Sequence, residues 1–284
     1  MISSRITKNI SLYAFLLMII LLLPSNSSFI GGNRTNKDNI IGRNFNVCKR
    51  FKGKVLLYFI WGKTKNSYEW MEFDVSSTID SIKVAIEWLN QQAAKNDIDL
   101  KIRIDINQDT TGGLYQRMGG EVENLISERN GIEKVNKWTN RIARMASGYK
   151  TKERLIAHLR NEHQLESVGL IFLLNNYFER DFAFSFNTTS DADVEYSIIS
   201  TKNPVVFAQE ILNLFGAPYL YSHPSVRNKR DTRQLQKIFP NDIMGNPTLN
   251  IHELNIGEVT KYYIGWTDEL NEEYERMVKE KAKI

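Results

Sequence analysis

Cysteine is nearly missing from this sequence, with Cys48 the only one among 284 residues. A lone cysteine excludes an intramolecular disulfide, so a hydrophobic core has to hold the fold together. Cys48 also lies far beyond the N-terminal apolar segment, which argues against a lipid-modified cysteine at a cleavage point. We expect an inert thiol near the start of a strand, and pairing with another chain is the alternative.

An excess of one charge is also missing. The net charge is +4, and the basic residues form no cluster of the kind that binds a phosphate backbone. We therefore expect no nucleic-acid partner. Apolar residues make up 42% and charged residues 25% of the chain, which is typical of a globular protein and excludes extensive disorder outside the ends.

Only one apolar run is long, from Ile10 to Leu23. Arg5 and Lys8 precede it and a polar stretch of small residues follows, which is typical of a secretory signal peptide. A membrane-spanning helix usually needs about 20 apolar residues, so an uncleaved anchor that tethers the chain through this run is the second interpretation. We assign residues 1–28 to a signal peptide or N-terminal anchor and expect a secreted or extracytoplasmic protein.

The rest of the chain is predicted to be a flexible leader, residues 29–52, followed by a single domain over 53–284. The leader is rich in Asn, Gly, Ser and basic residues without periodicity. Apolar runs, alternation and helical spacing then indicate the elements of the domain. The expected strands are 55–61, 101–106, 168–174, 182–186 and 196–199. The expected helices are 79–93 with an N-cap at Ser76 or Ser77, 121–146, 151–165, 204–215 and one from about Asp268, with loops over 107–120 and 217–265.

The helix expected over 204–215 carries the most suggestive chemistry. It reads QEILN from Gln209 to Asn213, and Gly216 then ends it three residues before Tyr219. Ile243-Met244-Gly245 follows farther along. This pattern resembles the signature of metzincin-type zinc metallopeptidases, HExxHxxGxx followed by His or Asp, with a later methionine turn.

The resemblance implies a fold and a set of roles. It covers roughly residues 53–267 and implies an α/β (α+β) fold with a mixed twisted sheet, an active-site-type helix and a loop-rich C-terminal part. Glu210 stands where the family has the general base that activates a zinc-bound water. Gly216 and Met244 stand where it has the turning glycine and the methionine of the turn.

All three zinc-ligand positions of the family differ in this chain. Gln209 and Asn213 replace the two histidines, and Tyr219 replaces the third ligand. Carboxamide oxygens are weak ligands for zinc, and a phenol titrates near 10. We therefore expect no zinc or other cofactor and no functional catalytic residue, with Glu210 left as a degenerate base.

Binding without catalysis is the function that this pattern favours. The resemblance places a peptide cleft between the helix and an edge strand, lined by Gln209, Glu210, Asn213, Tyr219 and Phe184. The expected partner is a peptide or protein outside the cytoplasm. Two alternatives stay open, an active zinc hydrolase with a non-standard metal site and a surface protein unrelated to peptidases.

A non-standard metal site would need other ligands. His223 follows the helix exit and His252 follows the methionine turn, and His223 with Glu210 and Asp242 is a conceivable set. His158 and His163 are five residues apart on an expected helix, which puts them on different faces. Surface or loop positions are the simpler interpretation of each histidine.

Overall fold

The computed structural model describes most of the chain beyond residue 46, and every described residue belongs to one compact unit, Ile40–Ile284. The described residues are 47–48, 50–65, 67–107, 114–115, 131–165, 167–176, 181–186, 194–221, 234 and 236–276. The expected signal peptide or anchor, residues 1–28, lies outside them. No helix within these ranges is long and apolar enough to cross a membrane.

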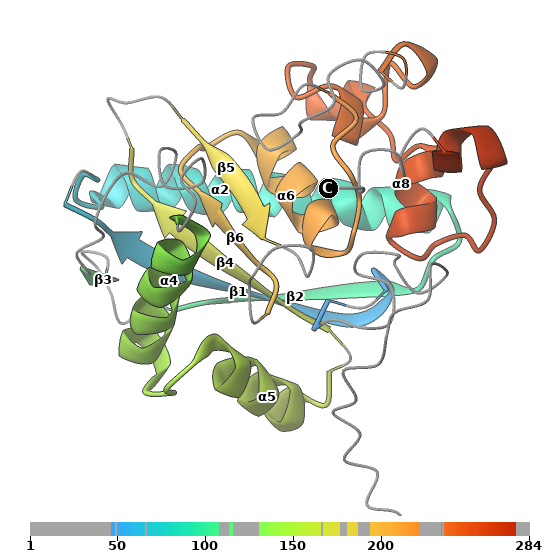
Figure 1. The fold of residues 1–284 in the computed structure, drawn as a ribbon. Coiled ribbons are helices and arrows are strands. Elements are labelled where there is room, and N and C mark those ends of the chain that lie inside the picture. Colours follow the sequence, from blue (N-terminus) through green and yellow to red (C-terminus); the bar gives the residue numbers. More distant parts are fainter. Residues whose placement is uncertain are drawn as a thin grey trace, which may run out of the picture. The chain divides into compact units, whose positions relative to one another are not determined.

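A mixed sheet forms the centre of this unit, with its strands in the order β2-β1-β4-β6-β5 (Figure 1). All neighbouring strands are parallel except β5, which runs antiparallel to β6, and β3 extends the sheet beside the end of β1. The central strands β1 and β4 are covered on both faces, which explains their continuous apolar sequences. The bounds are β1 Gly53–Lys63, β2 Leu100–Ile106, β3 Leu114–Tyr115, β4 Ser167–Leu174, β5 Ala183–Phe186 and β6 Tyr196–Ile199.

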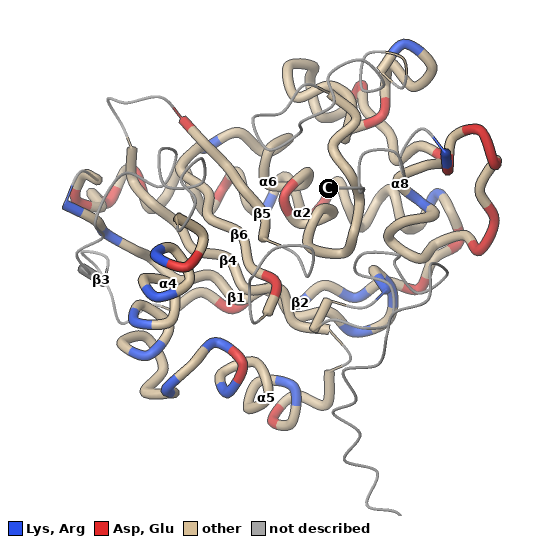
Figure 2. The backbone as a smooth tube through the Cα atoms, viewed as in Figure 1, with Lys and Arg blue, Asp and Glu red and all other residues tan. Residues whose placement is uncertain are grey.

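Helices cover both faces of the sheet, with α2 and α6 on one face and α4 and α5 on the other (Figure 1). Acidic and basic residues are intermixed along α4 and α5 (Figure 2). Because side chains alternate along a strand, β1 directs Leu57 and Phe59 into the core under α2 and α6, and Leu56 and Ile60 into the other core. The bounds are α2 Glu72–Lys95, α4 Gly131–Ser147, α5 Lys152–His163 and α6 Pro204–Leu214.

The C-terminal part consists of short helices joined by loops, and it packs on the side of α2 and α6. Its short helices are η1 Ile243–Gly245, η2 Ile251–Glu253 and α8 Glu258–Tyr263. The expected loop-rich character of this part is confirmed. The helix expected from about Asp268 is described as helical only over 272–276.

The prediction of a flexible leader up to residue 52 is wrong at its C-terminal end. Cys48 and Phe51 are fully buried, and Phe51 donates its backbone N–H to Ile264 O at 2.9 Å. The Phe51 ring also lies 4.7 Å from that of Phe215. Cys48 donates to Val168 O at 3.3 Å, so its thiol lies in the interior, where it could not pair with another chain without local opening.

Other boundaries also differ from expectation. The helix expected from Ile79 starts earlier, at Glu72, so the predicted N-cap at Ser76 or Ser77 is wrong, and Ser77 instead bonds back to Phe73 O inside the helix. The expected loop 107–120 contains the short strand β3, and the helix expected over 121–146 is described from Gly131 onward. The order of the remaining strands and helices is confirmed.

Candidate functional site

Local sequence fixes both ends of α6. Asn203 caps the helix by accepting the N–H of Val205 at 2.9 Å, and Pro204 occupies the first turn, where its missing N–H costs nothing. Gly216 has φ = 102°, a conformation that favours glycine. Gly216 N bonds to Asn213 O and Ala217 N to Leu212 O, the two hydrogen bonds of a Schellman motif. This sharp exit returns the chain toward the helix, which brings Tyr219 over Glu210.

Glu210 is the centre of a largely buried hydrogen-bond cluster, which we call the Glu210 cluster: Ser185, Ser197, Glu210 and Tyr219. The Tyr219 hydroxyl lies 2.6 and 2.7 Å from the two carboxylate oxygens of Glu210. Ser185 Oγ donates to Glu210 Oε2 at 2.5 Å and lies 2.6 Å from Ser197 Oγ. Hydroxyl groups therefore contact both oxygens of the carboxylate.

Ser185 and Ser197 are the cluster members that the sequence did not point to, and Phe184, the neighbour of Ser185, was predicted to line the site instead. Ser185 lies directly opposite Ser197 in the β5–β6 pairing and faces α6. Phe184 packs in the core under α4 and α5, on the opposite face of the sheet. The prediction that Phe184 lines the same site as Glu210 is therefore wrong. The alternation of Phe and small residues along this strand contained the signal, since only one parity can face α6.

Burial governs the ionisation of the cluster. Loss of solvent raises the pKa of Glu210 to about 7, although hydrogen bonds from Ser185 and Tyr219 oppose that change. Burial and the neighbouring carboxylate together raise the pKa of the Tyr219 phenol well above its usual value. Tyr219 is therefore a neutral hydrogen-bond donor rather than an anionic ligand. A carboxyl group with a pKa near 7 has the acid strength of a general acid or base.

The two carboxamides at the other ligand positions are tied to backbone carbonyls. Gln209 Nε2 donates to Ile243 O at 2.5 Å, and Asn213 Nδ2 donates to Ala217 O at 2.9 Å. Gln209 thus connects α6 to the methionine turn, and Asn213 closes the helix exit. Within the described part of the chain, the buried Gln209 Oε1 has no hydrogen-bond donor.

Asp242 organises the methionine turn. It accepts hydrogen bonds from Met244 N at 2.7 Å, from Gly257 N at 2.9 Å and from Thr260 Oγ1 at 2.9 and 3.0 Å. Burial raises the pKa of Asp242 to about 6, and these donors limit the rise. Met244 is fully buried beneath α6, and its carbonyl accepts the N–H of Leu220 at 2.7 Å. Asp242 is thus a structural carboxylate of the turn rather than a free ligand.

The side chains present do not fit a zinc ion. The amide nitrogens of Gln209 and Asn213 point to carbonyls, and Tyr219 is protonated and donates to Glu210. Zinc prefers imidazole, thiolate and carboxylate ligands. Within the described ranges, no group of three or more His, Cys, Asp or Glu side chains could hold a metal ion.

The three histidines that the structure describes do not gather at this site. His252 is exposed on η2, His158 contacts Glu162 at 2.9 Å, and His163 lies 3.2 Å from Arg103. His223 lies outside the described residues, so its part in the conceivable set with Glu210 and Asp242 stays a prediction.

The expected cleft residues lie in the interior. Gln209, Glu210, Asn213 and Tyr219 are between 0 and 6% exposed. Two surface hollows lie elsewhere and are lined by other residues, one between α2 and β2 and the other between β2 and α5. The sequence therefore identified side chains that do meet around α6, but they form a closed polar core rather than the wall of an open cleft.

Comparison with protein-family models, with curated proteins and with solved structures finds no match to this chain. Its function has to be inferred from its own residues.

Proposed function

We propose that this chain is a catalytically silent relative of metzincin-type zinc peptidases that acts outside the cytoplasm by binding an extended peptide or protein segment. The order of elements supports the relationship: strand, helix, strand, helical insert, strand, edge strand, strand and helix. The glycine exit of α6 and the turn around Met244 support it as well. The proposal includes no zinc and no nucleic-acid partner.

One observation carries the loss of catalysis: the Tyr219 phenol and the Ser185 hydroxyl contact the carboxylate oxygens of Glu210. In a zinc peptidase the corresponding carboxylate has to face a metal-bound water. Here the Tyr219 phenol instead donates its hydrogen bond directly to the Glu210 carboxylate. A water without a Lewis acid keeps a pKa near that of bulk water, so Glu210 alone cannot turn it into a strong nucleophile at neutral pH.

The edge strand β5 is the proposed binding element, since it ends the described sheet beside α6. Ser200 N donates to Phe182 O at 2.9 Å, so these residues face each other across the β5–β6 ladder. Backbone groups alternate in direction along a strand, which places those of Ala183 and Ser185 on the outer side. An added peptide strand would form hydrogen bonds with these groups. The partly exposed Ser185 would then connect the bound peptide to the Glu210 cluster, because its hydroxyl donates to Glu210.

A peptide-binding assay with a matched pair of variants tests this proposal. We expect the purified full chain to bind members of a library of extended peptides, measured by fluorescence polarisation. Ser185→Pro removes an outward N–H, which an edge strand tolerates, and should abolish binding. Ser185→Ala keeps the N–H and should retain it. Binding no stronger than background by the wild-type chain would defeat the binding function.

A designed metal site tests the family relationship. The triple substitution Gln209→His, Asn213→His and Tyr219→Asp should create a site that holds about one zinc per chain, because it restores imidazole and carboxylate ligands on the inherited backbone. Elemental analysis of the folded variant measures the metal. Failure of the folded variant to retain zinc would count against the relationship and favour a surface protein unrelated to peptidases.

The same analysis of the wild-type chain separates the proposal from an active hydrolase. Stoichiometric zinc in wild-type protein, with peptidase activity that Glu210→Gln removes, would support the hydrolase and contradict the silent relative.

A further inference from the structure

The opposite edge of the sheet differs from β5 in length and chemistry. β2 has seven residues, and among the described strands it pairs only with β1. Edge strands of this length are usually protected by charged side chains, proline, a bulge, an inward-pointing charge or a covering helix or loop. β2 has regular register with β1 over its whole length and contains no proline. Among the described residues, no strand pairs with its other side.

The backbone groups on this open side can be identified. Gly53 N donates to Asp99 O and Asn107 N donates to Phe59 O, so the odd-numbered residues of this segment bond toward β1. Backbone groups alternate in direction along a strand. The N–H and C=O groups of Ile102, Ile104 and Ile106 consequently point outward from the sheet.

The side chains of β2 alternate between an apolar row and a charged row. Ile102, Ile104 and Ile106 are partly exposed and lean on the core beneath α2. Lys101 and Arg103 are exposed on the other face. On that face Arg103 and Asp105 line the hollow beside α5.

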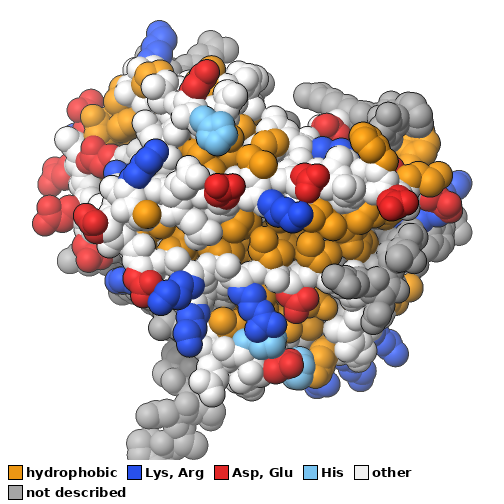
Figure 3. Space-filling model, turned by 180° about the vertical axis from the view of Figure 1, so that it is seen from behind, with side chains coloured by type: hydrophobic (Ala, Val, Ile, Leu, Met, Phe, Trp, Pro, Cys, Tyr) orange, Lys and Arg blue, Asp and Glu red, His pale blue; other side chains and the backbone are white. Residues whose placement is uncertain are grey.

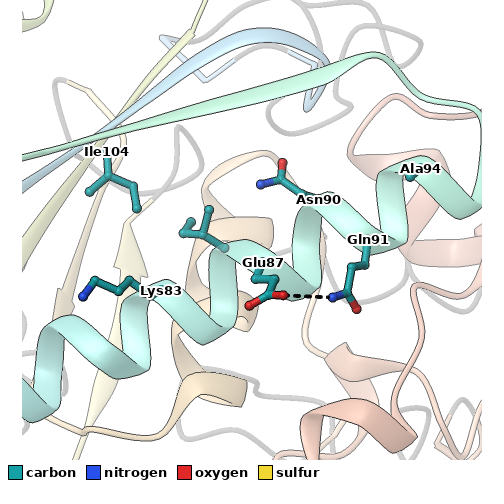
Figure 4. Close-up of a pocket in the computed structure, with 7 residues that line it drawn as sticks. Lys83, Glu87, Asn90, Gln91, Ala94 and Ile104 are labelled. Carbon is teal, nitrogen blue, oxygen red and sulfur yellow. Dashed lines mark hydrogen bonds between the residues drawn. The ribbon is translucent and has the colours of Figure 1, made fainter.

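The apolar row opens into a hollow of about 530 Å³ between β2 and α2. Figure 4 shows Ile104 facing the helix across this hollow, with Lys83 and Glu87 on the helix side. From behind, hydrophobic side chains gather in a band across the middle of the molecule (Figure 3). An added strand with apolar residues of the same spacing would cover the hollow.

We propose that the occupant of this edge is a second copy of the chain, joined β2 to β2 in antiparallel fashion about a two-fold axis at Ile104. In this register Ile104 faces its own copy, and Ile102 faces Ile106 of the other chain. These outward-pointing residues exchange backbone hydrogen bonds in pairs. On the charged face, Arg103 lies opposite Asp105 of the other chain, and the symmetry makes this ion pair twice.

Charge selects this register over its neighbour. Moving the axis to Arg103 would also pair outward backbone groups and would place Lys101 opposite Asp105 of the other chain, but it would place the two Arg103 side chains directly opposite each other. Like charges directly opposite on a sheet are destabilising, whereas opposite charges stabilise the pair. An edge that complements itself in both its apolar and its charged row fits a copy of itself, as a two-fold interface requires.

Charge reversal and its rescue test the dimer. We expect the full chain, kept in a mild detergent so that residues 10–23 do not cause association, to have the mass of a dimer by light scattering. Arg103→Asp or Asp105→Arg alone should raise the dissociation constant more than about tenfold. The double variant Arg103→Asp with Asp105→Arg should restore dimerisation. A mixture of the two single variants should form heterodimers, because each chain then supplies the charge that the other lacks.

Two controls keep the test specific. Lys101→Asp makes the same change of charge on the same face, but in this register it lies opposite the partner's Asn107, so dimerisation should be nearly unchanged. Reductant should also have no effect, because Cys48 is buried. A monomer at about 100 µM would overturn the proposal. So would a dimer that tolerates Arg103→Asp, or one that Lys101→Asp disrupts as strongly as Arg103→Asp does.

Discussion

Asp74 and Glu210 are two buried carboxylates whose surroundings favour opposite states of ionisation. They are 5% and 1% exposed, respectively. Asp74, on α2, accepts a hydrogen bond from the Lys202 ammonium at 2.5 Å. Glu210, on α6, accepts from the hydroxyls of Tyr219 and Ser185, which carry no charge.

The difference between these donors decides the pKa of each group. Burial raises the pKa of Asp74, but hydrogen bonds from Lys202 and Asn175 and the positive charge of Lys202 lower it below its usual value overall. Burial also raises the pKa of Glu210, and two hydroxyls leave it at about 7. A neighbouring cation therefore lowers the pKa of a buried carboxyl group by more than desolvation raises it, whereas neutral donors do not.

The largest effect is expected from removing the cation beside Asp74. Lys202→Met leaves a buried carboxylate without its charged partner and should lower the free energy of unfolding by about 3 kcal/mol at neutral pH. Because the folded-state pKa of Asp74 is depressed, its stabilising contribution exists above the unfolded pKa and disappears as the pH falls through the folded value. The loss should therefore shrink in acid, measured by urea unfolding across pH.

A surface ion pair supplies the matched control. Lys63 and Glu69 lie 2.5 Å apart, but the Glu69 side chain is 69% exposed. Lys63→Met should leave the unfolding midpoint unchanged within error. Equal destabilisation by the two methionine variants would show that burial of the carboxylate does not set the strength of the interaction.

The second effect concerns the pH dependence that Glu210 imposes. Its folded pKa of about 7 lies above the model-compound value of 4.5, so the folded state binds the proton more tightly. The contribution of Glu210 to the free energy of unfolding is fully present below its pKa in the unfolded chain, and it is lost as the pH rises through 7. The free energy of unfolding of the wild-type chain should therefore fall between about pH 5.5 and pH 8. In Glu210→Gln this fall should be smaller by about 2 kcal/mol.

Some slope should persist in that variant. Burial also raises the pKa of Glu195 to about 7 and that of Asp242 to about 6, and both act in the same direction. An unchanged slope in Glu210→Gln would mean that its carboxyl group keeps an ordinary pKa in the folded protein.

The smallest effect is expected from removing one neutral donor. Tyr219→Phe takes a hydroxyl from the Glu210 carboxylate and should cost about 1 to 2 kcal/mol at pH 8, and less at pH 5.5, where the carboxyl is protonated. Tyr263→Phe is the control, since the hydroxyl of this buried tyrosine makes no hydrogen bond to a described residue. A loss that is equal at both pH values would mean that Tyr219 contributes packing alone.

Much of the framework around the site could be predicted from local sequence. The apolar runs identified the central strands, and Pro204 and Gly216 marked the ends of α6 closely, because caps and glycine turns depend on neighbouring residues. Local signals of the same kind wrongly predicted that Ser76 or Ser77 caps α2, although both residues lie inside that helix. Tertiary packing extended α2 beyond that point, which a local cap signal cannot anticipate.

The partners of Glu210 were harder to predict because they come from distant segments. Ser185 is 25 residues from Glu210 in sequence, and it meets the carboxylate only because β5 turns back beside β6 under α6. Phe184 was predicted to line the site as part of the edge strand, whereas the face of the strand decides which of its residues contact α6. Phe51 was assigned to the leader for a similar reason, since its contacts with Phe215 and Ile264 are far away along the chain.

By itself, the sequence determined which residues occupy the helix positions 209, 210 and 213 and where the chain turns after them. Those features follow from helical spacing and from glycine, and both are local. Only the tertiary structure decided that Glu210 is surrounded by hydroxyls and that Asp74 has a cation. Ionisation depends on desolvation and on charges brought close by folding, and neither is encoded within a few residues of the titrating group.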